Sequence, residues 1–175
     1  MNIVLLGYMG CGKSTIGRVL ADHLSMKYLD LDSFIEAEEQ LKIAEIFEQK
    51  GEIYFRKKET EYLEHCLTTH ENTILSLGGG TPCFGTNMER IKNAKNNKSI
   101  YLKTGLDELV SRLLPEKEKR PLIAHLNTKE ALNDFVRKHL FERSFYYNQA
   151  EYAVVTDAKN VIQIVDEIKD LLPEN

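Results

Sequence analysis

The sequence predicts an α/β protein built on an open, five-stranded parallel sheet with helices on both faces. Short apolar runs alternate along the chain with longer segments whose apolar residues recur at helical spacing, which is the pattern of βαβ units. The apolar runs are continuous, as in strands buried on both faces of a parallel sheet. With 42% hydrophobic and 29% charged residues in a chain of 175, we expect a single globular domain over residues 1–175.

The predicted strands are short and end at turn-forming residues. The first is bounded by Gly7, and the third is followed by three glycines at 78–80. Such an apolar run between turn signals is typical of a buried strand. The five predicted strands are Ile3–Leu6, Tyr28–Leu31, Thr73–Leu77, Ser99–Lys103 and Tyr152–Thr156.

The segments between these strands carry helical periodicity. In the first of them, Ile16, Val19, Leu20 and Leu24 would share one helix face. Gly51 is placed like a helix stop. Pro115–Asn127 (PEKEKRPLIAHLN) breaks the pattern and is interpreted as a solvated loop or a mobile lid. The predicted helices are Lys13–Leu24, Ile43–Lys50, Arg56–Leu67, Asp107–Leu114, Thr128–Gln149 and Val161–Leu172.

Composition narrows the classes of function. Lys and Arg number 23 against 27 Asp and Glu, a net charge of -4, which does not favour general nucleic-acid or anionic-membrane binding. The three cysteines contain no C-x-x-C pair, which argues against a disulfide framework and a cysteine zinc site. The start MNIVLLGYMG lacks the features of a signal peptide, and no apolar stretch approaches the roughly 20 residues of a membrane span. We therefore expect a cytoplasmic protein.

A phosphate-binding motif follows the first predicted strand. Gly7–Ser14 (GYMGCGKS) matches G-x-x-x-x-G-K-[ST] and leads into the first predicted helix. Gly10 and Gly12 let the backbone turn its N–H groups onto phosphate oxygens, beside the positive end of that helix. Lys13 can reach the β- and γ-phosphates, and Ser14 can place its hydroxyl on Mg²⁺. The motif predicts a site for a nucleoside triphosphate with Mg²⁺.

The rest of the chain favours a small kinase over a GTPase or a motor ATPase. A GTPase needs the guanine-reading pattern N-K-x-D, but Asn97-Lys98 is followed by Ser-Ile. Motor ATPases and helicases usually have longer chains. A kinase needs a second substrate pocket and a lid, and the remaining motifs supply candidates for both.

Two carboxylates lie at the end of the second predicted strand. Asp30 and Asp32 would point to the same side of that strand, at the sheet edge where ligands bind in this architecture. We interpret one as facing the Mg²⁺ shell and the other as facing an acceptor hydroxyl. The alternative is that Asp32 only caps the next helix.

Arginines placed beside glycines suggest where an anionic acceptor binds. Arg56 and Glu59 are three residues apart on a predicted helix and can touch, which would leave the guanidinium to clamp a carboxylate or phosphate. Gly78–Gly80 would let a ligand approach the backbone closely. Arg120 in the lid and Arg143 on a long helix could neutralise further charge. Each feature alone also fits an ordinary surface ion pair or turn.

Taken in order, these motifs resemble the shikimate kinase family over essentially the whole chain. The resemblance implies a phosphate-loop kinase fold that transfers the γ-phosphoryl group of ATP to the 3-hydroxyl of shikimate, in aromatic amino-acid (chorismate) biosynthesis. It also implies a lid at about 115–127, a helical substrate-binding region at about 32–62, and a monomer. The matching motifs are G-x-M-G-x-G-K-S-T at 7–15, D-x-D at 30–32, F-R-x-x-E at 55–59, G-G-G at 78–80, R-P-L at 120–122 and E-R-x-x-x-Y at 142–147.

The resemblance also implies roles for individual residues. Lys13, Asp32 and Arg120 would be catalytic, with Asp32 accepting the proton of the 3-hydroxyl. Ser14 would bind Mg²⁺ directly and Asp30 through water. ATP would be held by Gly10, Cys11, Gly12, Lys13, Ser14, Thr15, Arg112 and Arg120. Shikimate would be held by Asp32, Arg56, Glu59, Gly78, Gly79, Gly80 and Arg143, with Phe47 and Phe55 as walls.

The chain departs from the family pattern at two places. Glu151 stands where the family often has alanine, and Thr156–Asn160 (TDAKN) matches the adenine loop poorly, so we assign no base contact there. Competing interpretations are a related metabolite kinase, such as a gluconate kinase, and a non-catalytic nucleotide-binding regulator. The two arginines with G-G-G favour shikimate, and the intact Lys13, Ser14, Asp32 and Arg120 favour catalysis.

Overall fold

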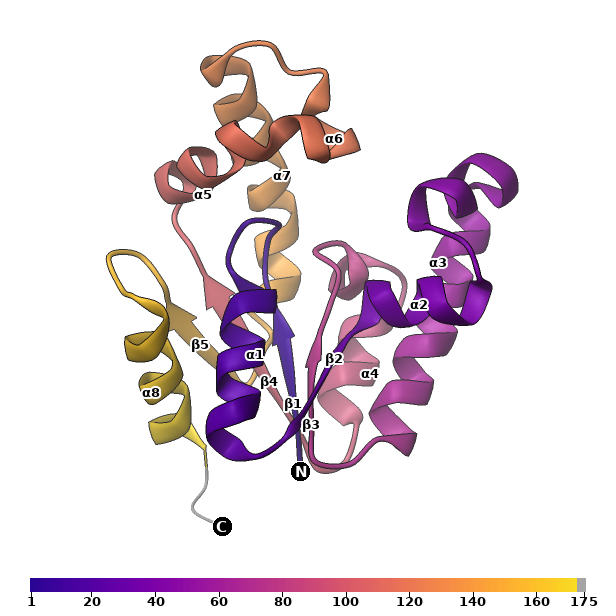
Figure 1. Ribbon diagram of the computed structural model, residues 1–175, viewed down its shortest axis with the longest axis vertical. Coiled ribbons are helices and arrows are strands. Elements are labelled where there is room, and N and C mark those ends of the chain that lie inside the picture. The colour runs from indigo at the N-terminus through magenta and orange to yellow at the C-terminus, as the bar shows by residue number, and fades with distance from the viewer. Residues whose placement is uncertain (173–175) are drawn as a thin grey trace.

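The computed structural model describes residues 1–172 and has a five-stranded sheet at its centre (Figure 1). Neighbouring strands are all parallel, and their order is β2-β3-β1-β4-β5. The predicted α/β fold is therefore confirmed. The last three residues of the predicted 1–175 domain lie outside the described residues. The strands are β1 (Asn2–Leu6), β2 (Lys27–Asp30), β3 (Thr73–Ser76), β4 (Asn97–Lys103) and β5 (Tyr152–Val155).

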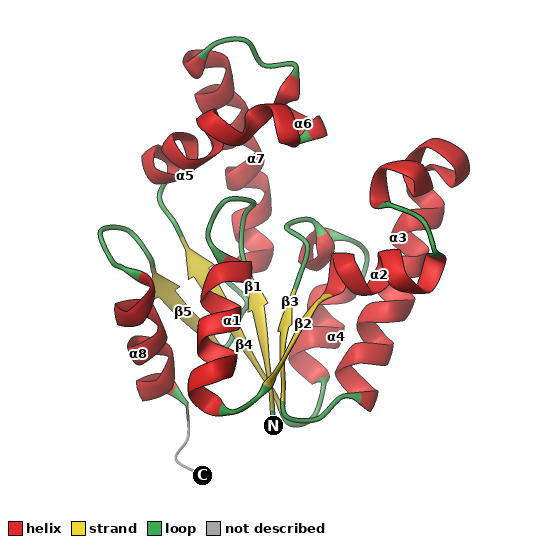
Figure 2. Cartoon of the chain, viewed as in Figure 1, coloured by secondary structure: helices red, strands yellow, loops and turns green. Residues whose placement is uncertain are grey.

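Helices cover both faces of the sheet (Figure 2). The helices α1 (Lys13–Leu24) and α8 (Val161–Leu171) pack against each other in front of it, and α1 also packs on β3. Behind the sheet, α4 (Asn87–Asn93) packs on β4 and on α3 (Ile43–Thr69). The long helix α7 (Lys129–Tyr147) packs against α5 (Leu106–Leu113). The sequence analysis did not predict α4.

The end of β2 differs from the prediction in a way that affects the site. The strand stops at Asp30, and Leu31 opens α2 (Leu31–Glu39), a helix that was not predicted. Asp30 is the N-cap of α2, and its Oδ1 accepts a hydrogen bond from the Ser33 N–H at 3.2 Å. The prediction that Asp30 and Asp32 share one strand is therefore wrong, as is the alternative that Asp32 caps the helix. The short side chain of Asp30 satisfies a helix-end N–H, so the chain turns into a helix directly after the strand.

The helix α3 has a break at Gly51, where the sequence predicts a helix stop. Gly51 has φ 82° and ψ 167°, so the helix runs as two segments on either side of it. The second segment starts directly after Gly51, four residues earlier than the predicted start at Arg56. The first segment stands out from the body of the molecule (Figure 1).

The predicted lid contains short helices. A 3₁₀ helix, η2 (Leu114–Lys119), is followed by α6 (Pro121–Ala124). Pro115 and Pro121 each lie in the first turn of one of them, a position where proline's missing N–H and fixed φ favour the helix. Ile123 is fully buried. The Pro115–Asn127 segment is therefore a folded cover above the sheet edge (Figure 1).

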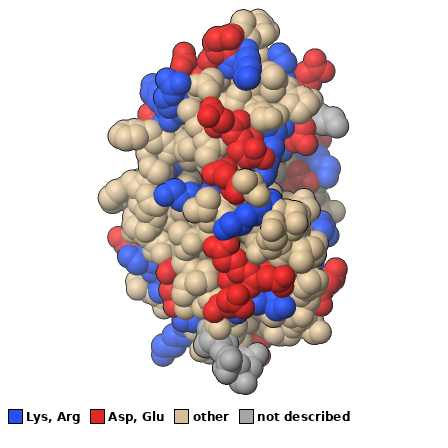
Figure 3. Space-filling view, turned by 90° about the vertical axis from the view of Figure 1, so that its left-hand side faces the viewer, with Lys and Arg blue, Asp and Glu red and all other residues tan. Residues whose placement is uncertain are grey.

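Charges of both signs are distributed over the surface. Lys and Arg side chains are interspersed with Asp and Glu side chains on the face shown in Figure 3. Across residues 1–172, none of the helices has the length and apolar character needed to cross a bilayer.

Candidate active site

A cavity of about 580 Å³ opens at the carboxyl ends of β1 and β3. In an open parallel sheet this is where the chain leaves neighbouring strands in opposite directions and where ligands bind. The cavity brings together residues that the sequence analysis singled out from four separate motifs, together with Arg112. Those among its lining residues are Gly10, Gly12, Lys13, Ser14, Thr15, Asp30, Asp32, Gly78, Gly79, Arg112 and Arg120.

The phosphate loop has the backbone that its glycines predict. Gly10 and Gly12 have φ of 82° and 96°, a left-handed region that side chains disfavour. Gly12 is the N-cap of α1, so the first turn of that helix starts at Lys13, at the cavity wall. The loop therefore presents a helix N-terminus and its backbone N–H groups, which together form an anion site.

Lys13 is folded back onto the loop. Its Nζ donates to the carbonyl oxygens of Gly7 at 2.9 Å and Tyr8 at 3.1 Å, and it lies 3.7 Å from Cys11 Sγ. The Cys11 side chain is fully buried, and its N–H donates to the Tyr8 carbonyl at 3.2 Å. The Cys11 thiol is therefore not exposed to the cavity.

Oxygen ligands suited to Mg²⁺ gather beside the loop. Ser14, Asp30, Asp32 and Ser76 all line the cavity, and hydroxyl and carboxylate oxygens are the ligands that Mg²⁺ prefers. The Tyr28 hydroxyl donates to Asp30 Oδ2 at 3.4 Å, and burial raises the pKa of Tyr28, against the smaller effect of the nearby hydroxyls of Ser14 and Ser76, which act to lower it. The residues present therefore fit a magnesium ion. Sequence reasoning missed Tyr28, because it was interpreted only as a strand residue.

Asp32 lies in the first turn of α2, where negative charge is concentrated. Burial, together with the nearby carboxylates of Asp30 and Glu59, raises the pKa of its carboxyl to about 6, although the Lys13 ammonium opposes the shift. Desolvation and like charge both disfavour the ionised form. A carboxyl with a pKa just below neutral can accept a proton at neutral pH and also favours a cation nearby.

The three glycines at 78–80 face three of the predicted substrate residues in turn. A Cβ atom would lie 2.9 Å from Asp32 Oδ1 at Gly78, 3.4 Å from Arg143 Nη1 at Gly79, and 3.2 Å from Arg56 Nη1 at Gly80. Glycine at these positions leaves space beside one carboxylate and two guanidinium groups. Residues from α2, α3 and α7 thus converge on one short loop.

Arg56 is fixed by a buried carboxylate. Its Nη1 donates to Glu59 Oε2 at 2.8 Å, and Glu59 Oε1 accepts from the Thr81 hydroxyl at 2.6 Å. Glu59 is only 1% exposed. The guanidinium carbon of Arg56 lies 5.2 Å from the Phe55 ring centroid, which is itself 4.7 Å from the Phe47 ring centroid. Thr81 was missed, because nothing in its local sequence indicates a partner 22 residues earlier.

The helix α7 brings Arg143 to the same loop and also contacts the phosphate loop. The Tyr147 hydroxyl donates to the Gly79 carbonyl at 2.5 Å, and the Arg143 guanidinium carbon lies 5.7 Å from the centroid of the Tyr8 ring. The Tyr8 hydroxyl is hydrogen-bonded to His139 Nδ1 at 3.1 Å. Burial lowers the pKa of His139, and the nearby Arg143 lowers it further. Neither Tyr8 nor His139 was singled out from the sequence.

Two arginines reach the cavity from the lid side. Arg112 Nε pairs with Glu108 at 2.8 Å, and Arg112 Nη1 lies 3.4 Å from the Gly10 carbonyl. Arg120 Nη2 pairs with Glu116 at 2.8 Å. The Nε of Arg120 is buried and has no hydrogen-bond partner among the described residues, which is unusual for a buried donor.

Of the two places where the chain departs from the family pattern, one lies at the cavity and the other does not. Lys159, in the segment to which we assigned no base contact, lines the cavity together with Val161 and Ile164. Glu151 pairs with Lys98 at 2.5 Å instead, and neither residue lines the cavity.

The family model that matches the chain is that of shikimate kinase, and the match runs from residue 9 to residue 173. The chain belongs to the shikimate kinase family. The shikimate kinase of Flavobacterium johnsoniae is 49% identical to it over 171 residues, which cover 98% of each chain. That of Flavobacterium psychrophilum is 44% identical over the same share.

Solved structures of shikimate kinases show the same fold. The enzyme from Bacteroides thetaiotaomicron matches with a TM-score of 0.89 at 33% identity, covering 98% of this chain and 97% of that one. The enzyme from Acinetobacter baumannii, solved in complex with shikimate, matches with a TM-score of 0.82 at 31% identity, covering 97% of this chain and 91% of that one.

These relationships confirm the predicted enzyme class. The chain is a shikimate kinase, an ATP-dependent transferase of aromatic amino-acid biosynthesis that uses Mg²⁺. They decide against the gluconate kinase and the non-catalytic regulator considered above.

Proposed function

We propose that this chain phosphorylates the 3-hydroxyl of shikimate with Asp32 beside the hydroxyl and Arg56 and Arg143 on the carboxylate. The observation that carries the proposal is the arrangement around Gly78–Gly80, which places the carboxylate of Asp32 and both guanidinium groups next to successive glycines. Shikimate is a small ring that carries hydroxyl groups and one carboxylate. The carboxylate requires a positively charged partner, and the hydroxyl that receives the phosphoryl group requires a proton acceptor. Both kinds of side chain lie beside the glycine loop.

The carboxylate end is held by guanidinium groups that are positioned in advance. Arg56 is oriented by the buried Glu59, and Arg143 projects from a helix tied to the same loop by Tyr147. A guanidinium can meet a carboxylate with two parallel hydrogen bonds. The paired rings of Phe47 and Phe55 form an apolar wall beside Arg56.

Asp32 acts as the proton acceptor in this proposal. Its pKa of about 6 leaves it mostly ionised at neutral pH, yet basic enough to take the hydroxyl proton as the new bond to phosphorus forms. A pKa near the working pH is what general base catalysis requires. Because Gly78 has no side chain, a substrate hydroxyl can come close to the carboxylate.

The nucleotide side neutralises phosphate charge. The loop N–H groups around Gly10–Thr15 and the N-terminus of α1 would hold the phosphates, and Lys13 would exchange its contacts with the loop carbonyls for phosphate oxygens. Arg112 and Arg120 would add charge from the lid side, where the unpartnered Nε of Arg120 supports a role for a bound anion. Ser14, with Asp30 acting through water, would hold Mg²⁺ beside the phosphates, and the ion would supply further charge neutralisation.

We further propose one domain over 1–175, acting as a monomer in the cytoplasm. The nucleotide-side residues line one cavity, and Arg56 and Arg143 of the same chain lie beside the glycine loop at its edge, which supports a site completed within one copy. Cys11, Cys66 and Cys83 are unpaired, as expected of a protein in a reducing compartment.

The proposed roles can be tested by product analysis and one substitution. Phosphorus NMR of the reaction with shikimate and MgATP should show a single monoester coupled to the proton at carbon 3. Lys13→Met should abolish this product, because phosphoryl transfer depends on charge neutralisation, while the thermal unfolding curve should keep one transition. Turnover of Lys13→Met within about tenfold of wild type would contradict the proposed role of Lys13 and the proposed placement of ATP.

A further inference from the structure

The helix α3 is interrupted at Gly51, and the angle between its two segments must be fixed by contacts elsewhere. The segment before Gly51 carries Phe47, and the segment after it carries Phe55 and Arg56. A Cβ atom at Gly51 would find no atom within 4 Å, so packing at the glycine itself does not fix the angle between the segments. A glycine with φ 82° can adopt many conformations. Something else must hold the two segments in their relative positions.

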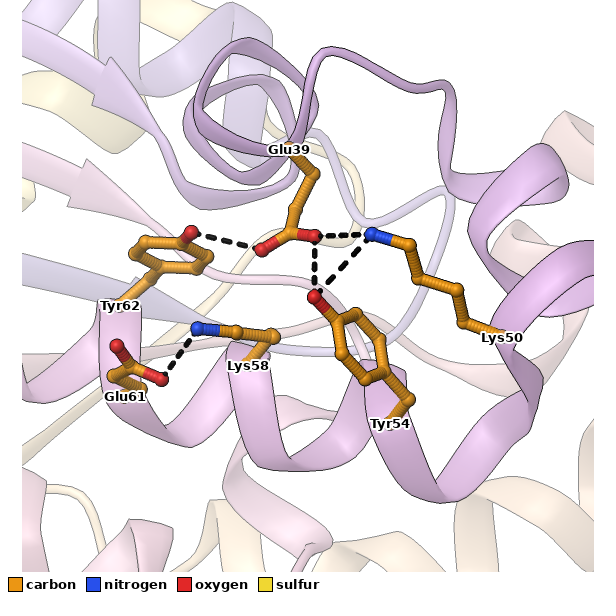
Figure 4. Close-up of polar contacts among 6 residues, drawn as sticks. All are labelled: Glu39, Lys50, Tyr54, Lys58, Glu61 and Tyr62. Atoms are coloured by element: carbon orange, nitrogen blue, oxygen red, sulfur yellow. Dashed lines mark hydrogen bonds and ion pairs between the residues drawn. The ribbon is translucent and has the colours of Figure 1, made fainter.

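One carboxylate contacts both segments. Glu39, the last residue of α2, accepts hydrogen bonds from Lys50 Nζ at 2.9 Å, from the Tyr54 hydroxyl at 2.7 Å and from the Tyr62 hydroxyl at 2.9 Å (Figure 4). Lys50 lies just before the break, whereas Tyr54 and Tyr62 lie after it. The Glu39 side chain is only 6% exposed. It therefore ties α2 to the first segment through Lys50 and to the second through the two tyrosines.

The contacts around Glu39 reinforce each other. Lys50 Nζ also lies 3.3 Å from the Tyr54 hydroxyl and 4.6 Å from the centroid of its ring, so these two residues touch directly across the break. The hydrogen bonds from Tyr54 and Lys50 lower the pKa of Glu39 to about 2. The carboxylate is thus ionised throughout the pH range in which an assay would be run.

The positions that Glu39 fixes are next to residues of the acceptor site. Phe47 lies one helical turn before Lys50, and Phe55 directly follows Tyr54. The rings of Phe47 and Phe55 meet at 4.7 Å between centroids, and the Arg56 guanidinium lies against Phe55. A change in the angle at Gly51 would separate Phe47 from Phe55. Shikimate would then have to restore that contact when it binds.

We propose that Glu39 is a positioning residue of the acceptor site, which fixes the angle of α3 at Gly51 and so pre-forms the wall beside Arg56. This inference rests on the proposed placement of shikimate next to Arg56. No group assigned to the reaction touches Glu39, so its contribution is to binding of the acceptor through preorganisation.

The other ion pairs of this region do not have this role. Glu36 accepts from the Ile43 N–H at 3.0 Å and from Lys42 at 2.8 Å, and so anchors only the start of the first segment. The Lys58–Glu61 pair, also shown in Figure 4, lies wholly on the second segment. Among these acidic residues, Glu39 is the one whose hydrogen-bond partners lie on both sides of Gly51.

The test is Glu39→Gln, with KM and kcat measured for both substrates. The amide keeps the size of the side chain but loses its charge and cannot accept at both ends. We expect the KM for shikimate to rise about tenfold, the loss typical of one charge-assisted contact. The KM for ATP and kcat at saturating shikimate should stay within about twofold. Equal rises in both KM values, or an unchanged KM for shikimate, would overturn the proposal.

Glu64→Gln is the matched control. It makes the same chemical change on α3, the helix that Glu39 contacts, and breaks an ion pair with Arg90 of α4 at 2.5 Å, but it lies away from the break. We expect its KM for shikimate to match wild type. Hydrogen exchange supplies a direct structural readout: in Glu39→Gln the amides of residues 43–50 should exchange faster than in wild type, whereas those of residues 57–67 should not. A shikimate defect of equal size in Glu64→Gln would contradict the proposal.

A second variant covers the case in which Glu39→Gln folds poorly. Lys50→Met cuts only the link to the first segment and keeps the length of the side chain, so it should reproduce the shikimate defect. The double variant should be no worse than the more severe single variant, because both remove one linkage. If the increases in the shikimate KM of the two single variants instead multiplied in the double variant, Glu39 and Lys50 would not act through the same contact.

Arg56→Lys measured in parallel separates this inference from the proposed function. If Arg56→Lys leaves shikimate binding intact, the proposed acceptor site is wrong. If it weakens binding while Glu39→Gln and Lys50→Met do not, only the role of Glu39 is wrong.

Discussion

Arg56 and Glu59 form an ion pair at 2.8 Å in which the carboxylate, only 1% exposed, also receives the Thr81 hydroxyl at 2.6 Å. Both carboxylate oxygens therefore have a donor, and the guanidinium is held in one orientation beside Gly80. Thr81 follows the glycine loop directly, so the loop and the arginine are positioned by the same buried group. This relationship makes Arg56 a preformed site for an anion.

Arg56→Lys should weaken shikimate binding by about tenfold or more, because a lysine ammonium cannot reproduce the two parallel hydrogen bonds of a guanidinium. ATP binding should hardly change, since Arg56 does not line the nucleotide cavity. Calorimetric titration of each ligand measures both effects. Glu59→Gln should cause a smaller loss of the same kind by releasing Arg56. A parallel loss of ATP affinity would point to a general folding defect instead.

Asp32→Asn should lower kcat by about 10²–10⁴-fold, the range of general base catalysis. For the wild type, kcat/KM should fall as pH drops below about 6, because the base must be ionised and its pKa is raised to about 6. The rate measured from pH 5 to pH 8 checks this, and the acidic limb should be missing from the residual activity of Asp32→Asn. A wild-type kcat/KM that stays flat from pH 8 down to pH 5 would place the working carboxylate elsewhere.

The same raised pKa has a consequence for stability. Because the folded-state pKa of Asp32 lies above its ordinary value of 3.8, the folded state binds the proton more tightly, and the stabilisation from this group is lost as pH rises from about 4 to about 6. At pH 7 the ionised carboxylate would then cost up to about 3 kcal/mol. Asp32→Asn should therefore have a higher free energy of unfolding than wild type at pH 7, with the difference vanishing near pH 4. Urea unfolding at both pH values measures it, and a less stable Asp32→Asn at pH 7 would contradict the electrostatic assignment.

Arg120→Ala should lower kcat by about 10³-fold while changing the KM for shikimate little, since an arginine that meets charge developing on the phosphoryl group acts mainly in the transition state. Arg137→Ala, which removes an exposed arginine of α7 that pairs with Asp134, is the control. Should Arg120→Ala raise only the KM for shikimate, Arg120 would be a substrate clamp.

Gly17→Ala tests the packing beneath the site. Alanine normally stabilises a helix interior by about 1 kcal/mol relative to glycine, but a Cβ at Gly17 would lie 2.6 Å from Cε2 of Tyr28 and 3.1 Å from Cδ1 of Leu5. We expect a net loss of about 1–3 kcal/mol from overpacking, visible as a lower Tm. The double variant with Tyr28→Leu should lose less than the sum of the two single losses. A stabilised Gly17→Ala would show that Tyr28 moves aside freely.

The sequence was sufficient for the sheet and for the motif residues because their signals are local. The five apolar runs, the glycines of the phosphate loop and the stop at Gly51 each depend on neighbouring residues. The boundary at Asp30 was predicted wrongly because Leu31 continues the apolar run, and only the hydrogen bond from Ser33 shows that the helix has begun. The short helix α4 was missed because its first residue, Asn87, is a buried polar group.

The residues that support the site were harder to predict because their partners are distant in sequence. Glu39 contacts residues 11, 15 and 23 positions later, and Tyr8 meets His139 131 positions later. Each residue alone resembles an ordinary helix-surface or loop residue. Only the fold brings them together.

The most direct test of the central claim compares shikimate with an analogue that lacks only the carboxylate, for the wild type and for Arg56→Ala. Because Arg56 is proposed to bind the carboxylate, kcat/KM for wild type should favour shikimate over the analogue by about tenfold or more. For Arg56→Ala, most of that preference should be lost, with similar activity toward the analogue in both proteins. If wild type and Arg56→Ala discriminate equally between the two compounds, Arg56 does not hold the carboxylate and the proposed acceptor site is wrong.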